Sequence, residues 1–202
     1  MKLAHTFRQP FPQGVPDVSH FPQHTPESAP EAARARLQSG KDRFGFVPNL
    51  YAHLAEAPPA LDAYFDITAH YEKTSFDPVE RQVVMLAASA ENGCEFCMAA
   101  HSMMARRMVN APDAVVDALR ARGTLPDPKL QALAEFTRAM VRERGWVSGA
   151  PLEAFLAAGY TPRQALEVVL GVTMKTLSNY ANHLTGTATN PEFAAEAWTR
   201  PA

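Results

Sequence analysis

The amino-acid sequence predicts an all-α protein, and two observations support this. First, 17 prolines and 10 glycines in 202 residues divide the chain into segments of helical length. Second, no segment combines strict alternation of apolar and polar residues with the β-branched enrichment that is typical of strands. A chain of this length can fold as one domain with a sizeable core.

The first part of the chain is expected to form a proline-rich arm over residues 1–27, followed by a single helical domain over residues 28–202. Five prolines interrupt the arm without helical or strand periodicity: Pro10, Pro12, Pro16, Pro22 and Pro26. Phe7, Phe11 and Phe21 make the arm too apolar for a free tail. We therefore expect it to lie on the domain or on a neighbouring subunit.

Local signals place the helices of the first half. Ser28 can cap a helix that runs to about Gln38 and ends at Gly40. Two further helices are expected around residues 48–57 and 60–71. A fourth helix begins at Asp77, where a cap, a proline and Glu80 form a capping-box pattern.

The second half follows the same rules. The fourth helix is expected to end at Gly93, and a fifth to run from Cys94 to about residue 109. Further helices are expected over residues 114–122 and 128–144, over 152–158, and from 162 past 177. A terminal turn of helix is expected from residue 191.

Composition limits the function. The net charge of −2 gives no electrostatic reason to expect nucleic acid or a membrane surface as partner. The sequence contains neither an apolar run of about 18 residues nor the apolar core of a signal peptide at its start. We therefore expect a cytoplasmic protein, and in a reducing compartment a close cysteine pair is more often catalytic or metal-binding than structural.

Both cysteines of the chain lie three residues apart, at Cys94 and Cys97, and His101 follows one helical turn later. In a helix these three side chains form one stripe. Asn92 and Gly93 precede them as a stop signal, so the cysteines are expected at a helix N-terminus. The helix dipole there favours thiolate over thiol, as nucleophilic cysteines require.

Two other readings of the cysteine pair stay open. The residues could be small buried hydrophobes, or they could bind zinc. A structural zinc site usually has four ligands, and no second cysteine pair or histidine-rich hairpin supplies the others. We expect no metal ion and no cofactor, and thiol–disulfide chemistry is the preferred interpretation.

Several residues are candidates to orient His101 or to relay protons. Glu80 and Gln82 precede the cysteines on the fourth helix, but residues two apart on a helix point about 200° apart, so only one can face His101. Glu91 shares a helix face with Glu80, and His183 could line the pocket around the cysteines and His101. Each has a structural alternative: Glu80 in the capping box, Glu91 as a solvated charge, and His183 as a hydrogen-bonded structural residue.

The segment from Asp77 through Gln82 to Cys94, Cys97 and His101 resembles the carboxymuconolactone decarboxylase superfamily, and within it the alkyl hydroperoxidase D (AhpD)-like branch. Residues 45–50 and the region of His183 resemble segments of the same group. The resemblance implies an AhpD-like helical domain with its CxxC motif at the start of a central helix. It also implies a homo-oligomer, with a trimer or hexamer preferred and a dimer as the alternative.

By the same resemblance Cys94, Cys97 and His101 take the family's catalytic positions. The family often has a glutamate twelve residues before the first cysteine as part of a proton relay, and this sequence has Gln82 there. An amide can orient a histidine but cannot shuttle a proton as a carboxylate does. Decarboxylase members lack the cysteine pair, which argues against decarboxylation here.

These observations predict a thiol-dependent peroxidase or disulfide oxidoreductase. Cys97, nearer to His101, would attack a hydroperoxide or another small oxidised substrate, and Cys94 would resolve the sulfenic acid to a disulfide. A dithiol reductant, which the sequence does not identify, would restore the pair. The competing hypothesis is a non-catalytic redox sensor or interaction protein that uses the same pair as a switch.

Overall fold

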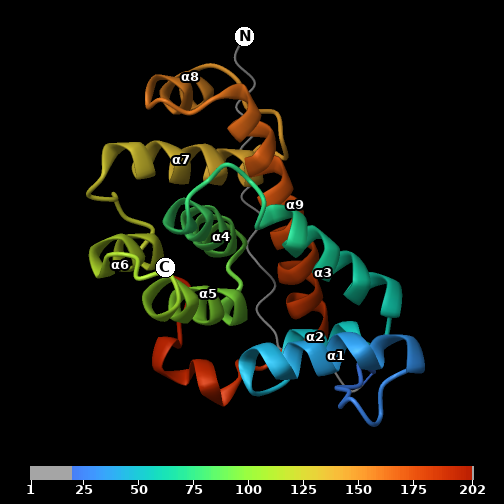
Figure 1. The fold of residues 1–202 in the computed structure, drawn as a ribbon. Helices are drawn as coiled ribbons and strands as arrows, with labels where there is room; N and C mark the ends of the chain where they lie inside the picture. Colours follow the sequence, from blue (N-terminus) through green and yellow to red (C-terminus); the bar gives the residue numbers. More distant parts are fainter. Residues whose placement is uncertain (1–19, 202) are drawn as a thin grey trace.

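The computed structural model describes residues 20–201, and these residues form helices and no strand (Figure 1). The predicted all-α fold is confirmed. The elements are α1 (Glu31–Phe44), α2 (Asn49–Leu54), α3 (Pro58–Tyr71), α4 (Pro78–Asn92), α5 (Glu95–Arg107), α6 (Asp113–Arg120), α7 (Pro128–Arg142), α8 (Ala150–Ala157), α9 (Pro162–Thr185) and a closing 3-10 helix, η1 (Pro191–Glu196).

Helix α4 forms the centre of the molecule, with α5, α6, α7 and α9 packed around it (Figure 1). Every residue from Val83 to Ala90 is buried. The predicted capping box is present at its start: Asp77 Oδ1 accepts a hydrogen bond from the Glu80 amide at 2.8 Å, and Glu80 Oε2 accepts one from the Asp77 amide at 3.1 Å. Gly93 ends the helix with a φ of 71°, a conformation that favours glycine.

Helix α9 runs from the α7–α8 end of the molecule to α2 (Figure 1). Thr161 and Gln164 form a second capping box at its start. At Gly171 a Cβ atom would lie 2.8 Å from both the Tyr71 ring and Val84. Glycine therefore lets α9 approach α3 and α4 closely, which brings the second half of α9 towards the cysteine helix.

The expected limits of the first helix are wrong at both ends. Ser28 does not cap it; the Ser28 hydroxyl instead accepts a hydrogen bond from the Thr25 amide at 2.9 Å, and α1 begins at Glu31. Gly40 does not end the helix. A glycine is required there for packing instead, since a Cβ at this position would lie 2.8 Å from the Tyr51 ring. The helix continues to Phe44 and ends at Gly45, which has a φ of 81°.

Part of the predicted arm lies against α2. The His24 amide donates to the Ala52 carbonyl at 3.1 Å, and His53 Nδ1 lies 3.2 Å from the Pro22 carbonyl oxygen. Phe21 is half-buried. Phe7 and Phe11 lie outside the described residues.

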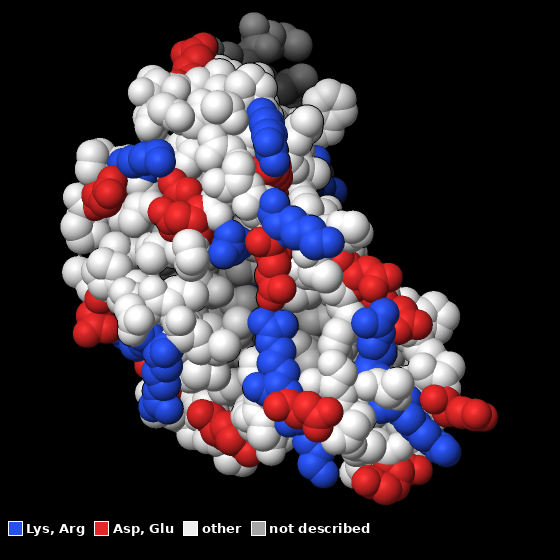
Figure 2. All heavy atoms as spheres, viewed as in Figure 1, with Lys and Arg blue, Asp and Glu red and all other residues white. Residues whose placement is uncertain are grey.

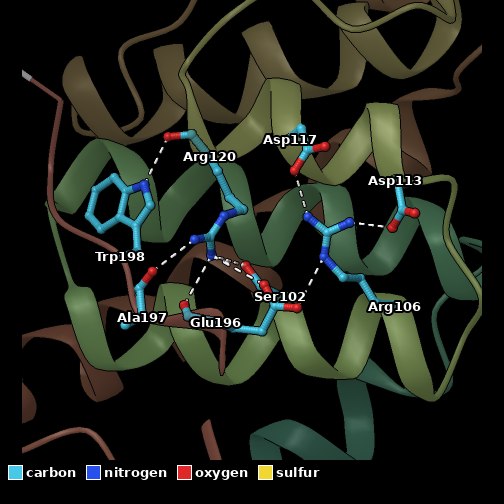
Figure 3. Close-up of polar contacts among 8 residues, drawn as sticks. All are labelled: Ser102, Arg106, Asp113, Asp117, Arg120, Glu196, Ala197 and Trp198. Atoms are coloured by element: carbon cyan, nitrogen blue, oxygen red, sulfur yellow. Dashed lines mark hydrogen bonds and ion pairs between the residues drawn. The ribbon is translucent and has the colours of Figure 1, made fainter. Parts of the chain in front are cut away.

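The C-terminal segment is fastened to α5 and α6 by arginine side chains (Figure 3). The Arg120 guanidinium donates to Ser102 Oγ at 2.9 Å, to the Glu196 carbonyl at 3.1 Å and to the Ala197 carbonyl at 2.9 Å. The Trp198 indole returns a hydrogen bond to the Arg120 carbonyl at 2.8 Å. The chain end is thus held over the helix that begins at the cysteines.

On the face drawn in Figure 2, basic and acidic side chains alternate instead of gathering into a patch of one sign. This face therefore offers no concentrated positive surface of the kind that attracts nucleic acid. Across residues 20–201, none of the helices has the length and apolar character needed to cross a membrane.

Candidate active site

The two cysteines sit where α4 ends and α5 begins. Cys94 is the N-cap residue of α5, its amide donates to the Ser89 carbonyl at 3.0 Å, and its carbonyl accepts from the Met98 amide at 3.0 Å. Cys97 lies in the first turn, as the sequence predicts. Both are free thiols, only 1% and 2% exposed for Cys94 and Cys97 respectively.

One amide on α9 contacts both sulfur atoms. Asn182 Nδ2 lies 3.5 Å from Cys94 Sγ and 3.3 Å from Cys97 Sγ. Ser178, one turn earlier on α9, places its hydroxyl oxygen 3.9 Å from Cys97 Sγ. The two sulfurs therefore share one hydrogen-bond donor, an arrangement that holds them together and stabilises negative charge on either.

Both ring nitrogens of His101 have partners. Gln82 Oε1 lies 3.0 Å from Nδ1, and Lys175 Nζ lies 3.0 Å from Nε2. Because a carbonyl oxygen only accepts, Nδ1 carries the proton, and Nε2 is left to accept from the lysine. The imidazole is thus a neutral link between Gln82 on α4 and Lys175 on α9.

The environment shifts the pKa values of the two thiols in opposite directions. Burial opposes ionisation of Cys97, but the hydrogen bond from Cys94, the positive charge of Lys175 and the hydrogen bonds with Ser178 and Lys175 outweigh it and lower the pKa of Cys97 to about 5. The hydrogen bond to Cys97, burial and the negative charge on Cys97 raise the pKa of Cys94 well above its ordinary value. Cys97 is therefore the thiolate and Cys94 the thiol at neutral pH.

His101 is not the source of the positive charge beside Cys97. Burial, and then the charge of Lys175, lower the pKa of His101 well below its ordinary value. A neutral imidazole cannot favour a thiolate by charge, so the positive charge that lowers the pKa of Cys97 is that of Lys175.

The two candidate carboxylates have other partners. Glu80 Oε1 accepts from Lys129 Nζ at 2.9 Å and from the Tyr160 hydroxyl at 3.0 Å, in addition to the capping box. Glu91 Oε2 pairs with Arg122 at 2.9 Å and lies 3.7 Å from Arg142. Of the three candidates on α4, only Gln82 contacts His101.

His183 lies beside the site but on its exposed side. Its ring lies over Tyr180, with ring centroids 6.5 Å apart, and burial lowers its pKa while the nearby Cys97 charge raises it. The adjacent Asn182, on the inner face of α9, makes the contacts to sulfur.

Sequence reasoning missed Lys175, Ser178 and Asn182. They share one face of α9, at spacings of three and four residues, and all three are buried. Polar residues at helical spacing were the available signal, because buried polar groups need partners of their own.

A cavity of about 370 Å³ reaches the His101–Gln82 pair from outside. Four methionines line it: Met85, Met104, Met108 and Met174. Arg43 and Glu72, which pair at 2.9 Å, are among its polar lining residues. The cavity is thus largely apolar with a few convergent polar groups, as is usual for small-molecule sites.

Within the described part of the chain, no three His, Cys, Asp or Glu side chains gather in a way that could hold a metal ion. The side chains of α9 that contact the sulfurs are the Asn182 amide and the Ser178 hydroxyl, and neither is a usual metal ligand. The arrangement is suited to ionising one thiol and presenting the other beside it.

Residues 55–139 match the model of the carboxymuconolactone decarboxylase family. This segment belongs to that family. It includes the cysteine pair and His101, and it ends before α9, which carries Lys175 and Asn182. The resemblance inferred from the sequence is confirmed.

Solved structures extend the family likeness over most of the chain. A Ralstonia eutropha protein described as an alkylhydroperoxidase AhpD core, an uncharacterized peroxidase-related protein, is 26% identical, with 87% of this chain and 94% of that chain covered and a TM-score of 0.76. A peroxidase-related protein from a Silicibacter species is 20% identical, with coverages of 87% and 93% and a TM-score of 0.73.

A third similar structure is the debrominase Bmp8 in complex with 2,3,4-tribromopyrrole, at 13% identity, coverages of 87% and 94%, and a TM-score of 0.72. This likeness concerns the fold alone. A comparison with curated proteins found no match. The AhpD-like helical fold is therefore established.

Proposed function

We propose that this protein is a thiol-dependent oxidoreductase that reduces hydroperoxides by cycling Cys94 and Cys97 between dithiol and disulfide. The observation that carries the proposal is the position of Asn182, whose amide lies within hydrogen-bond distance of both sulfurs. The lowered pKa of Cys97 supports its role as nucleophile, and the raised pKa of Cys94 supports its role as resolving thiol.

The oxidation proceeds in two steps. The Cys97 thiolate attacks the terminal oxygen of the hydroperoxide, the O–O bond breaks, and Cys97 becomes a sulfenic acid while the remaining oxygen leaves as alkoxide or hydroxide. Cys94 then attacks the sulfenic sulfur; the S–S bond forms, and the sulfenic oxygen leaves with the Cys94 proton as water. A dithiol partner, available in a reducing compartment such as the cytoplasm, reduces the disulfide by exchange.

The cavity beside His101 supports a substrate with an apolar part. Its four methionines provide a polarisable, adaptable lining, which hydrogen peroxide does not require. An organic hydroperoxide would place its carbon portion among the methionines.

The test is thiol counting before and after one equivalent of cumene hydroperoxide. Two free thiols should become none in the unaltered protein, and the Cys94→Ser variant should stop at a sulfenic acid on Cys97. Cys97→Ser should not react. Steady consumption of hydroperoxide with dihydrolipoamide as reductant separates an enzyme from a redox switch, which would oxidise once and not turn over.

A homo-oligomer is the second part of the proposal. The outward side of α9 exposes large apolar residues: Leu166, Val169, Tyr180 and Leu184. An uncovered apolar stripe of this kind is typical of an interface. Leu184→Glu should lower the mass measured by analytical ultracentrifugation, and deletion of residues 1–27 tests whether the arm takes part; unchanged mass in both would reject the assembly.

A further inference from the structure

Lys175 is a buried ammonium without a carboxylate. Its side chain is 0% exposed, and none of the ion pairs among residues 20–201 includes it. Burying a charge is costly unless an opposite charge lies beside it. Lys175 lies one helical turn before Ser178 on the same face of α9, and Ser178 Oγ lies 3.9 Å from Cys97 Sγ. The nearby group that can carry negative charge is therefore Cys97, whose pKa the positive charge of Lys175 lowers.

The contacts of His101 direct the lysine. Gln82 fixes the proton on Nδ1, so the lone pair on Nε2 points at Lys175 Nζ, 3.0 Å away. One N–H of the ammonium is thereby used, and the remaining N–H groups are free to point towards the sulfur. Gln82 and His101 act as positioning residues, because neither has to gain or lose a proton.

We propose that Lys175 is the counter-ion of the Cys97 thiolate and the acid that protonates the oxygen leaving the substrate. This inference deepens the proposed function and rests on it. In this proposal Lys175 on α9 supplies the proton, a role that a carboxylate in place of Gln82 would otherwise support.

The protons balance over the cycle. When the Cys97 thiolate takes the terminal oxygen of the hydroperoxide, the leaving alkoxide receives a proton from Lys175 and departs as an alcohol. Cys97 is then a sulfenic acid and Lys175 a neutral amine, so neither carries charge. Disulfide formation releases water and leaves Lys175 neutral. After a dithiol reduces the disulfide, the Cys97 thiol proton passes to Lys175 and restores the ion pair.

Other titratable groups packed near this part of α9 do not compete for the role. On α5, Cys94 has a raised pKa and His101 a lowered one. On α2 and α3, burial raises the pKa of Tyr51 to about 12 and that of Tyr64 and Tyr71 well above the ordinary value. On α4, the carboxylates are bound by Lys129 and by Arg122, as described above. On α9 itself, His183 is on the exposed side, and burial lowers its pKa while the charge of Cys97 raises it. Lys175 is the buried donor that contacts His101.

Two substitutions separate the two roles of Lys175, both made in a Cys94→Ser background so that only Cys97 reacts. Lys175→Met removes the charge, so alkylation of Cys97 by iodoacetamide at pH 7 should slow roughly 30-fold, the loss of thiolate when the pKa returns to about 8.5. Lys175→Arg keeps the charge but cannot release a proton at neutral pH. In the Lys175→Arg variant, Cys97 should be alkylated nearly as fast as in the parent. Its reaction with cumene hydroperoxide to form the sulfenic acid should be roughly 10-fold slower or more.

Lys73→Met, at an exposed lysine in the turn that follows α3, is the matched control and should change neither rate. Equal losses of alkylation and peroxide reaction in Lys175→Arg would overturn the acid role, and unchanged alkylation in Lys175→Met would overturn the counter-ion role. Circular dichroism spectra verify that each variant folds.

A measurement on the unsubstituted protein keeps the inference testable if the variants do not fold. The alkylation rate should rise with pH and level off, because it needs only the Cys97 thiolate. The rate with hydroperoxide should rise and then fall at alkaline pH, because that reaction also needs an acid to protonate the leaving oxygen. Two profiles of the same shape would overturn the acid role. Alkylation involves no peroxide, so it can support the counter-ion role even if the hydroperoxide assays reject the proposed function.

Discussion

Gln82 Oε1 accepts a hydrogen bond from His101 Nδ1 at 3.0 Å. A neutral amide thus occupies the position from which a carboxylate would make His101 basic. The amide fixes the tautomer without adding charge, so His101 remains neutral beside the positive Lys175. Two cations 3.0 Å apart in a buried site would repel each other strongly.

Gln82→Glu should therefore raise the pKa of His101, by about 1–2 units, because a carboxylate favours the imidazolium. The imidazole resonances of His101, followed by NMR from pH 4 to 8, measure the change. Gln164→Glu, which keeps the capping box of α9, is the control and should not move them. An unaltered His101 titration in Gln82→Glu would show that the two side chains do not interact in solution.

Asn182→Ala removes the amide that lies against both sulfurs. Hydrogen bonds to charged groups contribute about 1.5–3 kcal/mol, so losing the one to the Cys97 thiolate should raise the pKa of that thiol by roughly 1–2 units. The pH dependence of iodoacetamide alkylation measures it. Thr185→Ala removes a buried hydroxyl from the same helix, one that bonds only to Ala181 and Thr187. It should leave the alkylation profile in place.

The sequence predicts the parts of this structure that depend on local spacing. The capping box at Asp77 is local, because it is made within four residues. The stripe of Cys94, Cys97 and His101 is also local, since helix geometry alone places these side chains on one face.

The remaining features depend on contacts that are distant in sequence. From the sequence, Gly40 looks like the end of a helix. The glycine is there because the Tyr51 ring packs against the helix at this position, and this contact is not visible in the local sequence. Asn182 and Lys175 reach the site from 85 residues beyond Cys97 and 74 beyond His101. Their role follows from the packing of α9 on α4, which no local pattern specifies. The choice between Glu80 and Gln82 likewise required knowing which side of α4 faces α5.

The ionised Cys97 makes the stability of the reduced protein depend on pH. Its pKa is about 5 in the folded protein and near 8.5 in an unfolded chain. Between these two pH values the unfolded state binds more protons than the folded state. The contribution of the Cys97 thiolate to the free energy of unfolding is therefore fully present above pH 8.5 and is lost as the pH falls towards 5. His101, whose folded pKa is lowered, acts in the same direction below pH 6.5.

Urea unfolding under reducing conditions should therefore give a free energy of unfolding higher at pH 8 than at pH 6, with roughly 2 kcal/mol of the difference due to Cys97. Cys97→Ser should lose that part of the difference. The effect of Cys94, whose raised pKa acts in the opposite direction, begins only above pH 8.5 and lies outside this window. An equal pH dependence in Cys97→Ser and the parent would contradict the thiolate assignment.

Arg120 joins α6 to the chain end through hydrogen bonds with Ser102, Glu196 and Ala197 (Figure 3). Its side chain is 19% exposed, so Arg120→Ala leaves partly buried acceptors without donors. The free energy of unfolding should fall by about 2–4 kcal/mol. Arg163→Ala, at a 73% exposed side chain that pairs only with Glu167, should cost less than about 1 kcal/mol.

The same substitution tests whether the chain end shields the cysteines. The Arg200 side chain lies 3.3 Å from where a Cβ of Gly93 would be, next to Cys94. Release of this segment should expose the start of α5, so Cys94 should be alkylated faster in Arg120→Ala than in the parent at pH 9. A destabilised variant with unchanged Cys94 alkylation would show that Arg120 supports the fold without covering the site.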